Sequence, residues 1–216
     1  MILSTRVAKF LSVVFHPLLM PTLLFGILLY LAPGVLGVDA FTGTLRASLL
    51  VLLFIGTFGV PALLIYYLYR SGFVSSLHMD DRQERRVPYL LTGLIYTFLT
   101  FLFAFRMQLI SVVAPEIAVL LGSTAVSVLL VGIISLFWKI SAHSVGIGGV
   151  IGTIAGIMLK FNQTELFLVL LAVIILAGVL ASARLQLNAH TPGQIGAGLA
   201  LGLTISLITV FLFIRT

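Results

Sequence analysis

The stretch RLQLNAHTPGQ, residues 184–194, separates two long apolar runs, ELFLVLLAVIILAGVLASA (165–183) and IGAGLALGLTISLITVFLFI (195–214). Each run has close to the roughly 20 apolar residues that a helix needs to cross the hydrocarbon layer of a membrane. The polar strip between them contains an arginine, a histidine and a glutamine, which either join two helices or share a site. The pattern predicts two transmembrane helices with a polar turn between them.

The composition extends this prediction to the whole chain. Only 8% of the 216 residues are charged and the mean hydropathy is +1.26, whereas a soluble domain has about 25% charged residues. We therefore expect a single integral membrane domain covering residues 1–216. The absence of cysteine excludes disulfides and cysteine-ligated metals. The net charge of +6 comes without a basic run interleaved with aromatic residues, so we expect membrane lipids or an anionic substrate as partners, and no nucleic acid.

Seven stretches of the chain are long enough, or nearly so, to span a membrane. Their apolar residues are continuous rather than alternating, which excludes a closed barrel. The first stretch exceeds the 7–15 residues of a signal-peptide core and is expected to be a retained span. We predict an all-α, polytopic transmembrane helical bundle of six to seven spans. The predicted spans are 11–32, 47–69, 89–105, 115–137, 145–160, 165–183 and 195–214.

The polar residues between these spans are distributed unevenly. Segments 70–88, 138–144 and 184–194 are separated from one another by two crossings, so all three emerge on the same side of the membrane. They contain three of the four histidines, and the connectors on the opposite side contain none. We therefore predict one composite, cation-rich site at one membrane face. The cations of the three segments are Arg70, Arg82, Arg85, Arg86, Lys139 and Arg184.

Glycines recur every four residues in two of the predicted spans. Gly148, Gly152 and Gly156 follow this spacing in the fifth span, as do Gly198 and Gly202 in the seventh. Small residues at such intervals allow helix backbones to approach closely in lipid. We expect these glycines to pack helices together, and they leave assembly into a homo-oligomer open.

Arginines together with two histidines suit phosphate chemistry. Arginine binds phosphate oxygens in a bidentate manner and stays charged, while one histidine can attack phosphorus and another can protonate the leaving oxygen. A metal site built on His143 and His190 would lack third and fourth ligands, because Asp80, Asp81 and Glu84 lie among arginines that compete for them. The sequence thus favours a site without metal.

Three stretches resemble the motifs of the type-2 phosphatidic acid phosphatase superfamily of integral membrane lipid phosphatases. That family has K-x6-R-P, then P-S-G-H, then S-R-x5-H-x3-D. Here DDRQERRVP (80–88) stands at the first position, SAH (141–143) resembles the second and ARLQLNAHTPGQ (183–194) resembles the third. The order and the intervening distances agree over roughly residues 70 to 200.

The resemblance implies a role for each matching residue. His190 would be the nucleophile that forms a phosphohistidine, and His143 would be the acid that protonates the leaving group. Arg184, together with Arg86 or Arg85, would bind phosphate oxygens, with Arg82 in place of the missing lysine and a hydrogen bond from Ser141. The resemblance implies hydrolysis of a lipid phosphate or diphosphate, such as phosphatidate or an isoprenoid diphosphate, without a cofactor.

The chain departs from the family pattern at several positions. Met79 stands at the lysine position, Val87 separates Arg86 from Pro88, and Ala183 replaces serine. Gln194 stands where the family has the aspartate that orients the nucleophilic histidine. A glutamine can fix the histidine tautomer but supplies no charge, and together with the imperfect first motif this supports one alternative, an impaired member that binds an anionic lipid. A second alternative keeps the histidine chemistry and transfers the group to an acceptor alcohol.

Some of these residues also have a structural interpretation. Thr191, Pro192 and Gln194 fit the N-cap, N1 and N3 positions of a capping box at the start of the last span. This places His190 at a helix N-terminus, where backbone N–H groups favour anions. Lys139 follows Trp138 as an interfacial anchor pair, and His16, before Pro17, is expected to be structural.

The charges leave the orientation of the site undecided. The site side has eight Lys and Arg residues against four on the opposite side, which would make it cytoplasmic by the positive-inside rule. Five of the eight are candidate phosphate ligands or their neighbours, and without them the count is three against four. We expect a protein of the bacterial inner (cytoplasmic) membrane with the site on either face.

Overall fold

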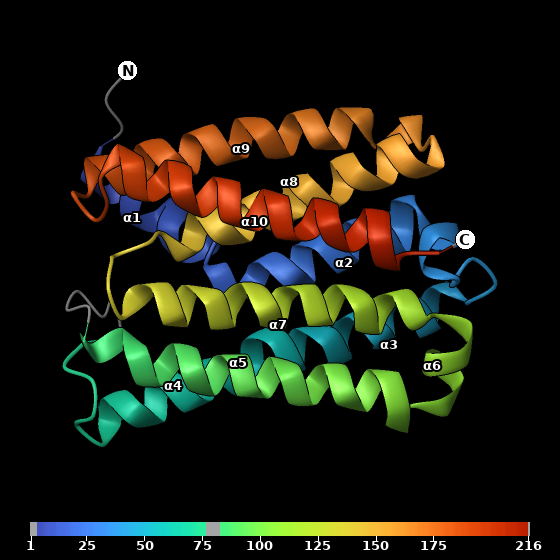
Figure 1. Ribbon diagram of the computed structural model, residues 1–216, viewed down its shortest axis with the longest axis horizontal. Helices are drawn as coiled ribbons and strands as arrows, with labels where there is room; N and C mark the ends of the chain where they lie inside the picture. Colours follow the sequence, from blue (N-terminus) through green and yellow to red (C-terminus); the bar gives the residue numbers. More distant parts are fainter. Residues whose placement is uncertain (1–3, 77–82, 216) are drawn as a thin grey trace.

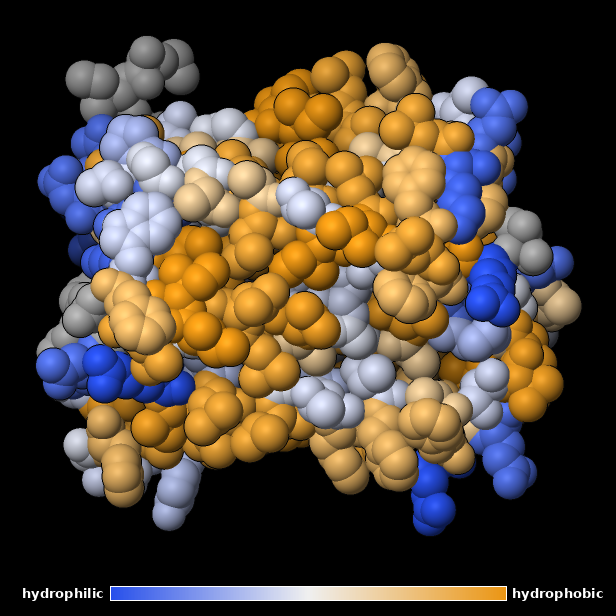
Figure 2. Space-filling model, in the orientation of Figure 1, coloured by the Kyte–Doolittle hydropathy of each residue, from blue (hydrophilic) through white to orange (hydrophobic). Residues whose placement is uncertain are grey.

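A computed structural model describes residues 4–76 and 83–215, and within this part of the chain the structure is all-helical, with 84% helix and no strands. Seven helical segments are long and apolar enough to cross a membrane, as predicted for an integral membrane protein. The space-filling view shows an apolar belt across the middle and hydrophilic residues at both ends (Figure 2). The segments are Thr5–Leu31, Gly43–Arg70, Gln83–Arg106, Pro115–Ser135, Ala142–Phe161, Thr164–Gln186 and Pro192–Phe213.

The spans agree with the predicted ones to within a few residues at most ends. The second span consists of α3 (Gly43–Phe54), a π-helical turn (Ile55–Gly59) and α4 (Val60–Arg70). Several helices begin before the predicted apolar run, because their first turns contain polar residues that a hydropathy pattern leaves out. The other long helices are α5 (Arg86–Phe101), α7 (Pro115–Ser135), α8 (Ala142–Phe161), α9 (Phe167–Gln186) and α10 (Pro192–Phe213), with the short α6 (Gln108–Val113) before α7.

The first span is broken, although the sequence predicted a continuous segment over 11–32. It begins earlier, with α1 (Thr5–Val14), which the Ser4 side chain caps by accepting from Val7 N at 3.3 Å. A 3-10 turn (Pro17–Leu19) then leads into α2 (Met20–Leu31). The cause is proline, which lacks the N–H that would continue the helix and disfavours helical geometry in the residue before it. The two halves have different neighbours: α1 packs against α9, and α2 against α3 and α8.

The glycines of α8 and α10 bring these two helices together, as expected from their spacing. A Cβ added at Gly148 would lie 2.5 Å from the Leu199 carbonyl oxygen, and one at Gly152 would lie 2.6 Å from that of Leu203. Gly198 faces Ser141 in the same way from the other helix. Only glycine permits this approach, and α10 crosses α8 at close range (Figure 1).

Lys160 fastens the far end of this helix pair. Its Nζ donates to the carbonyls of Val210, Phe211 and Ile214 at 3.0, 2.9 and 2.6 Å. These carbonyls lie at the C-terminal end of α10, where helix geometry leaves acceptors without intrahelical donors. Lys160 therefore joins the C-terminal ends of α8 and α10, opposite the predicted site. Toward the site, the glycines determine how closely the two helices pack.

Candidate active site

The three polar segments lie at one end of the bundle, as predicted from the number of crossings. The α4–α5, α7–α8 and α9–α10 connections meet at the left of Figure 1, where α1 also begins. The N-termini of α8 and α10 lie side by side there, and Ser141 N donates to the Gln194 carbonyl at 3.4 Å. Arg82 lies in segment 77–82, outside the described residues.

His190 is held in a tight turn between α9 and α10. The turn uses Asn188 at φ 50°, in the left-handed region, and a hydrogen bond from Ala189 N to the Arg184 carbonyl at 3.1 Å. Asparagine tolerates this conformation better than most residues. The turn folds His190 back into the protein, where only 8% of its surface is exposed.

The hydrogen bonds of Gln194 determine which nitrogen of His190 carries the proton. Gln194 Oε1 accepts from Thr191 N at 3.2 Å, so the oxygen of the amide must face the turn. The same oxygen lies 3.1 Å from His190 Nδ1, which therefore donates to it. A neutral imidazole with its proton on Nδ1 has a lone pair on Nε2, so Nε2 is the nitrogen that could act as a base or a nucleophile.

Gln194 is also part of the predicted capping box, which is confirmed. Gln194 N donates to Thr191 Oγ1 at 3.4 Å, and Oε1 accepts from the backbone of the cap residue. The glutamine thus begins α10 and orients His190 with a single oxygen. The capping of α10 and the contact with His190 are therefore compatible, and the structure contains both sets of hydrogen bonds.

Burial and neighbouring cations keep His190 uncharged. Burial lowers its pKa to about 4, and the charges of Arg184, Arg85 and Lys139 act in the same direction, against the hydrogen bond to Gln194. A neutral imidazole surrounded by cations has the protonation state of a nucleophile. The same cations would attract the negative oxygens of a phosphate.

The two adjacent arginines at the start of α5 have different surroundings. Arg85 is 6% exposed and donates a side-chain hydrogen bond to the Tyr89 phenol, whereas Arg86 is exposed. The electrostatic influence of Arg184 also extends to Tyr89. Of the two first-motif arginines, Arg85 is the one that lies near Arg184 and His190.

His143 and Ser141 lie in the first turn of α8 and at its N-cap. His143 Nε2 donates to the Ser12 carbonyl at 3.0 Å, and its ring packs edge-on against His16 with centroids 6.1 Å apart. Ser141 is fully buried, and its hydroxyl lies 2.9 Å from Ser144 Oγ and accepts from Ser144 N at 3.4 Å. Ser141 therefore caps α8, and its hydroxyl already has partners within the protein.

Three residues of this region were not among the predicted site residues. Ser12 Oγ accepts from Arg184 Nη1 at 3.2 Å, His16 contacts His143, and Tyr89 contacts Arg85. His16 has the structural role expected of it, because Nδ1 accepts from Leu18 N at 3.3 Å and caps the 3-10 turn. Pro17 is a sequence signal for an interruption of the first span. Nothing in the sequence indicated that the interruption would lie against His143 and Arg184.

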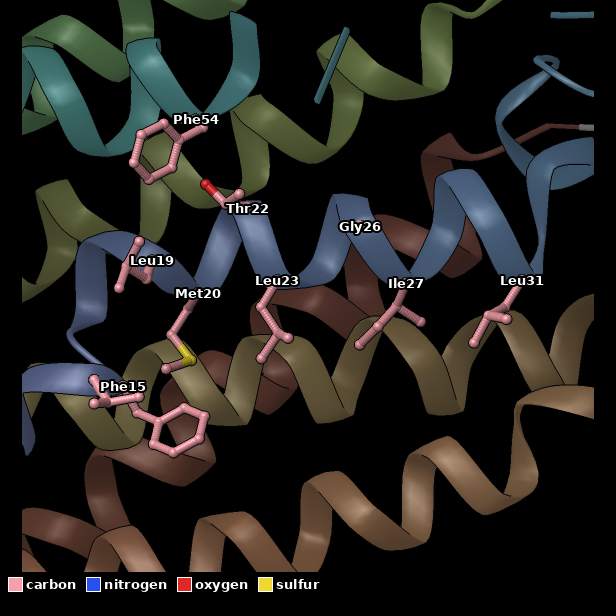
Figure 3. A pocket seen from close by; sticks show the side chains of 10 residues that line it. Phe15, Leu19, Met20, Thr22, Leu23, Gly26, Ile27, Leu31 and Phe54 are labelled. Atoms are coloured by element: carbon pink, nitrogen blue, oxygen red, sulfur yellow. The ribbon is translucent and has the colours of Figure 1, made fainter. Parts of the chain in front are cut away.

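An apolar cavity of about 560 Å³ begins beside these residues. It is lined from Val14 and Phe15, at the break in the first span, down to Leu31. Its lining includes Leu19, Leu23 and Ile27 at four-residue intervals, and the side chains of Leu23, Ile27 and Leu31 project from the same side of α2 (Figure 3). By the rise of 1.5 Å per residue, Leu19 to Leu31 spans about 18 Å, more than half of the hydrocarbon thickness.

The region thus combines a buried neutral histidine, two arginines, a second histidine and an adjoining apolar cavity. Among the described residues, no group of three His, Asp or Glu side chains is placed to hold a metal ion. Comparisons with protein-family models, with curated proteins and with solved structures find no match to this chain.

Proposed function

We propose that this protein is a membrane-embedded phosphatase of the type-2 phosphatidic acid phosphatase kind, acting on a lipid phosphate or diphosphate. The proposal rests mainly on the state of His190. Its imidazole is buried and neutral, has its proton on Nδ1, and lies beside Arg184 and Arg85. This protonation state and these neighbours suit covalent attack on phosphorus. No metal or organic cofactor is needed for the reaction.

The reaction would proceed in two displacements. His190 Nε2 attacks phosphorus, an N–P bond forms, and the P–O bond to the lipid breaks. The leaving oxygen would take a proton from His143 Nδ1, and His143 has to be a doubly protonated imidazolium at this step, because its Nε2–H is donated to Ser12. Water then attacks phosphorus and the N–P bond breaks. A proton of the water passes back to His143 Nδ1, inorganic phosphate leaves, and His190 Nε2 regains its lone pair. Arg184 and Arg85 would hold the phosphate oxygens in both displacements.

The cavity at the break supports a lipid as the substrate. It is apolar, it begins at Val14 and Phe15, and Ser12, one turn away, contacts both Arg184 and His143. A headgroup at His190 would leave its hydrocarbon chain within reach of this cavity. Burial of apolar surface would then retain the substrate while its phosphate is cleaved.

The test is release of inorganic phosphate from a panel of phosphatidate and isoprenoid mono- and diphosphates. We expect wild type to release phosphate and His190→Ala to release none. Gln194→Glu should exceed wild type by about tenfold or more, since it keeps the reach of the capping box and adds the missing charge beside His190. Gln194→Asp is one methylene shorter and should gain less.

One alternative is supported by a specific observation. Gln194 is uncharged, and a protein of this kind that binds a lipid phosphate without hydrolysing it would not need a charged residue beside His190. In that case wild type would bind a lipid phosphate without hydrolysis, and Gln194→Glu would restore release. Absence of both binding and release, in wild type and in this variant, would contradict the phosphatase and the binding protein alike.

A further inference from the structure

The break in the first span faces two motif residues that are far away in the sequence. Ser12 lies in the last turn of α1, is 8% exposed, and uses both of its oxygens. Its hydroxyl accepts from Arg184, 172 residues away, and its carbonyl accepts from His143, 131 residues away. A serine in a transmembrane helix more commonly bonds its hydroxyl to a carbonyl of its own helix.

The carbonyl of Ser12 is available because of Pro17. In a continuous helix the N–H of residue 16 would donate four residues back, to Ser12. Here His16 N donates instead to Val13, three residues back, at 3.2 Å, and His16 adopts the extended conformation typical before proline, with ψ 142°. The turn thus exposes the Ser12 carbonyl to a donor from another helix, which is His143.

His16 completes the arrangement from the other side of the break. Its Nδ1 is occupied by Leu18 N, which fixes the ring, and the ring packs edge-on against His143 at an interplanar angle of 70°. Two residues of the break therefore hold the ring of His143, one by a hydrogen bond and one by packing. The aromatic ring of His143 has little freedom to turn without breaking one of them.

We propose that the break in the first span is a positioning device for the site, in which Ser12 aligns Arg184 and His143 and His16 supports His143. The inference rests on the proposed function, because it assigns these two residues to phosphate binding and proton transfer. None of the three predicted motifs includes the first span. Ser12 and His16 act through other side chains, so both are positioning residues.

The test compares Ser12→Ala and Ser12→Thr with Ser4→Ala in the full-length purified protein. Ser12→Ala removes the acceptor for Arg184 and retains the backbone carbonyl, and Ser12→Thr keeps a hydroxyl. Ser4→Ala weakens the same helix at its first turn, eight residues before Ser12, where the Ser4 hydroxyl caps α1 by accepting from Val7 N. We measure kcat and KM for the best lipid phosphate and competitive inhibition by inorganic phosphate.

We expect Ser12→Ala to raise KM and to weaken inhibition by phosphate by the same factor, about threefold to tenfold, the effect of one hydrogen bond. The kcat should change much less, and Ser12→Thr should restore both values. Ser4→Ala should leave them at wild-type values. Equal effects of Ser12→Ala and Ser4→Ala would show a merely structural helix and overturn the inference.

A second variant tests the support of His143 without changing the fold of the break. His16→Asn keeps a side-chain oxygen that can cap Leu18 N, since asparagine is a preferred N-cap residue, but removes the ring. We expect kcat to fall at least threefold with KM nearly constant; an unchanged kcat would overturn the role of His16. If wild type neither binds nor hydrolyses a lipid phosphate, the proposed function fails. If wild type is active and the Ser12 and His16 substitutions leave kcat, KM and phosphate inhibition unchanged, only this inference is contradicted.

Discussion

At the scale of single residues, one amide oxygen determines the state of the proposed nucleophile. Gln194 Oε1 binds both Thr191 N and His190 Nδ1, so the start of α10 and the histidine tautomer depend on the same side chain. An aspartate in this place would add charge but would reach less far. The glutamine orients His190, and its hydrogen bond raises the pKa of the imidazole only in part against burial and the nearby cations, which lower it.

This environment predicts an unusual pH dependence. The pKa of His190 is lowered from 6.5 to about 4, so the folded protein keeps the ring neutral over a range in which the unfolded chain binds a proton. The contribution of this group to stability is therefore fully present above about pH 6.5 and is lost as the pH falls toward about 4. Activity that depends on neutral His190 should persist across the same range.

The measurement is kcat/KM between pH 4 and 8 for wild type and Gln194→Glu. We expect the acidic limb of the wild-type profile to lie near pH 4, because this parameter reports the free enzyme. The added carboxylate should move the limb upward, since a negative neighbour favours the charged imidazole. A wild-type limb at pH 6.5 that Gln194→Glu leaves unmoved would contradict the assigned environment of His190.

At the scale of elements, the packing of α8 against α10 places the site. The two helices begin next to each other because glycines at their contact let the two backbones approach closely, and Ser141 N then reaches the Gln194 carbonyl. The site is consequently as sensitive to the α8–α10 contact as to its own side chains. A substitution in the middle of the membrane should affect chemistry at the membrane face.

Gly202→Ala tests this dependence. Its Cβ would overlap the Val145 carbonyl, and Gly149 N would lie 2.7 Å away. We expect a loss of about 1–3 kcal/mol of stability, typical of overpacking, together with reduced phosphate release. The measurement is thermal unfolding in detergent, with phosphate release in parallel.

Gly196→Ala is the matched control on the same helix. Nothing lies within 4 Å of the Cβ that it would add, and alanine favours helix over glycine by up to about 1 kcal/mol. Its stability should therefore equal or exceed that of wild type. Equal losses in the two variants would show that α10 tolerates no alanine for reasons unrelated to α8.

At the scale of the whole molecule, the sequence was sufficient to predict six to seven spans, of which the structure has seven, and a common end for the three polar segments. Apolar length determines where a helix can span, and counting crossings determines the side, so neither needs tertiary contacts. The capping box and the glycine faces were equally accessible, because both depend on local spacing. These features account for His190, Gln194 and Arg184 lying at one end of the bundle.

Other features depended on packing that no local pattern contains. Arg85 and Arg86 are adjacent and differ by about 100° around the helix axis, so only the rotation of α5 determines which of them is buried. The partner of His143 lies 131 residues away in a span that the sequence indicated to be continuous. Pro17 could be recognised in the sequence as a residue that interrupts helices, but the helices that pack against the two halves of the span could not.

The central claim is that phosphate passes from a lipid to His190, and trapping the phosphoenzyme tests it most directly. Purified protein is mixed with lipid phosphate carrying a labelled phosphoryl group, quenched, digested and mapped, with His190→Ala alongside. We predict a label that is stable in base, labile in acid and confined to the peptide containing His190, and no label in His190→Ala. Labelling of another residue, or wild-type phosphate release by His190→Ala, would contradict the account.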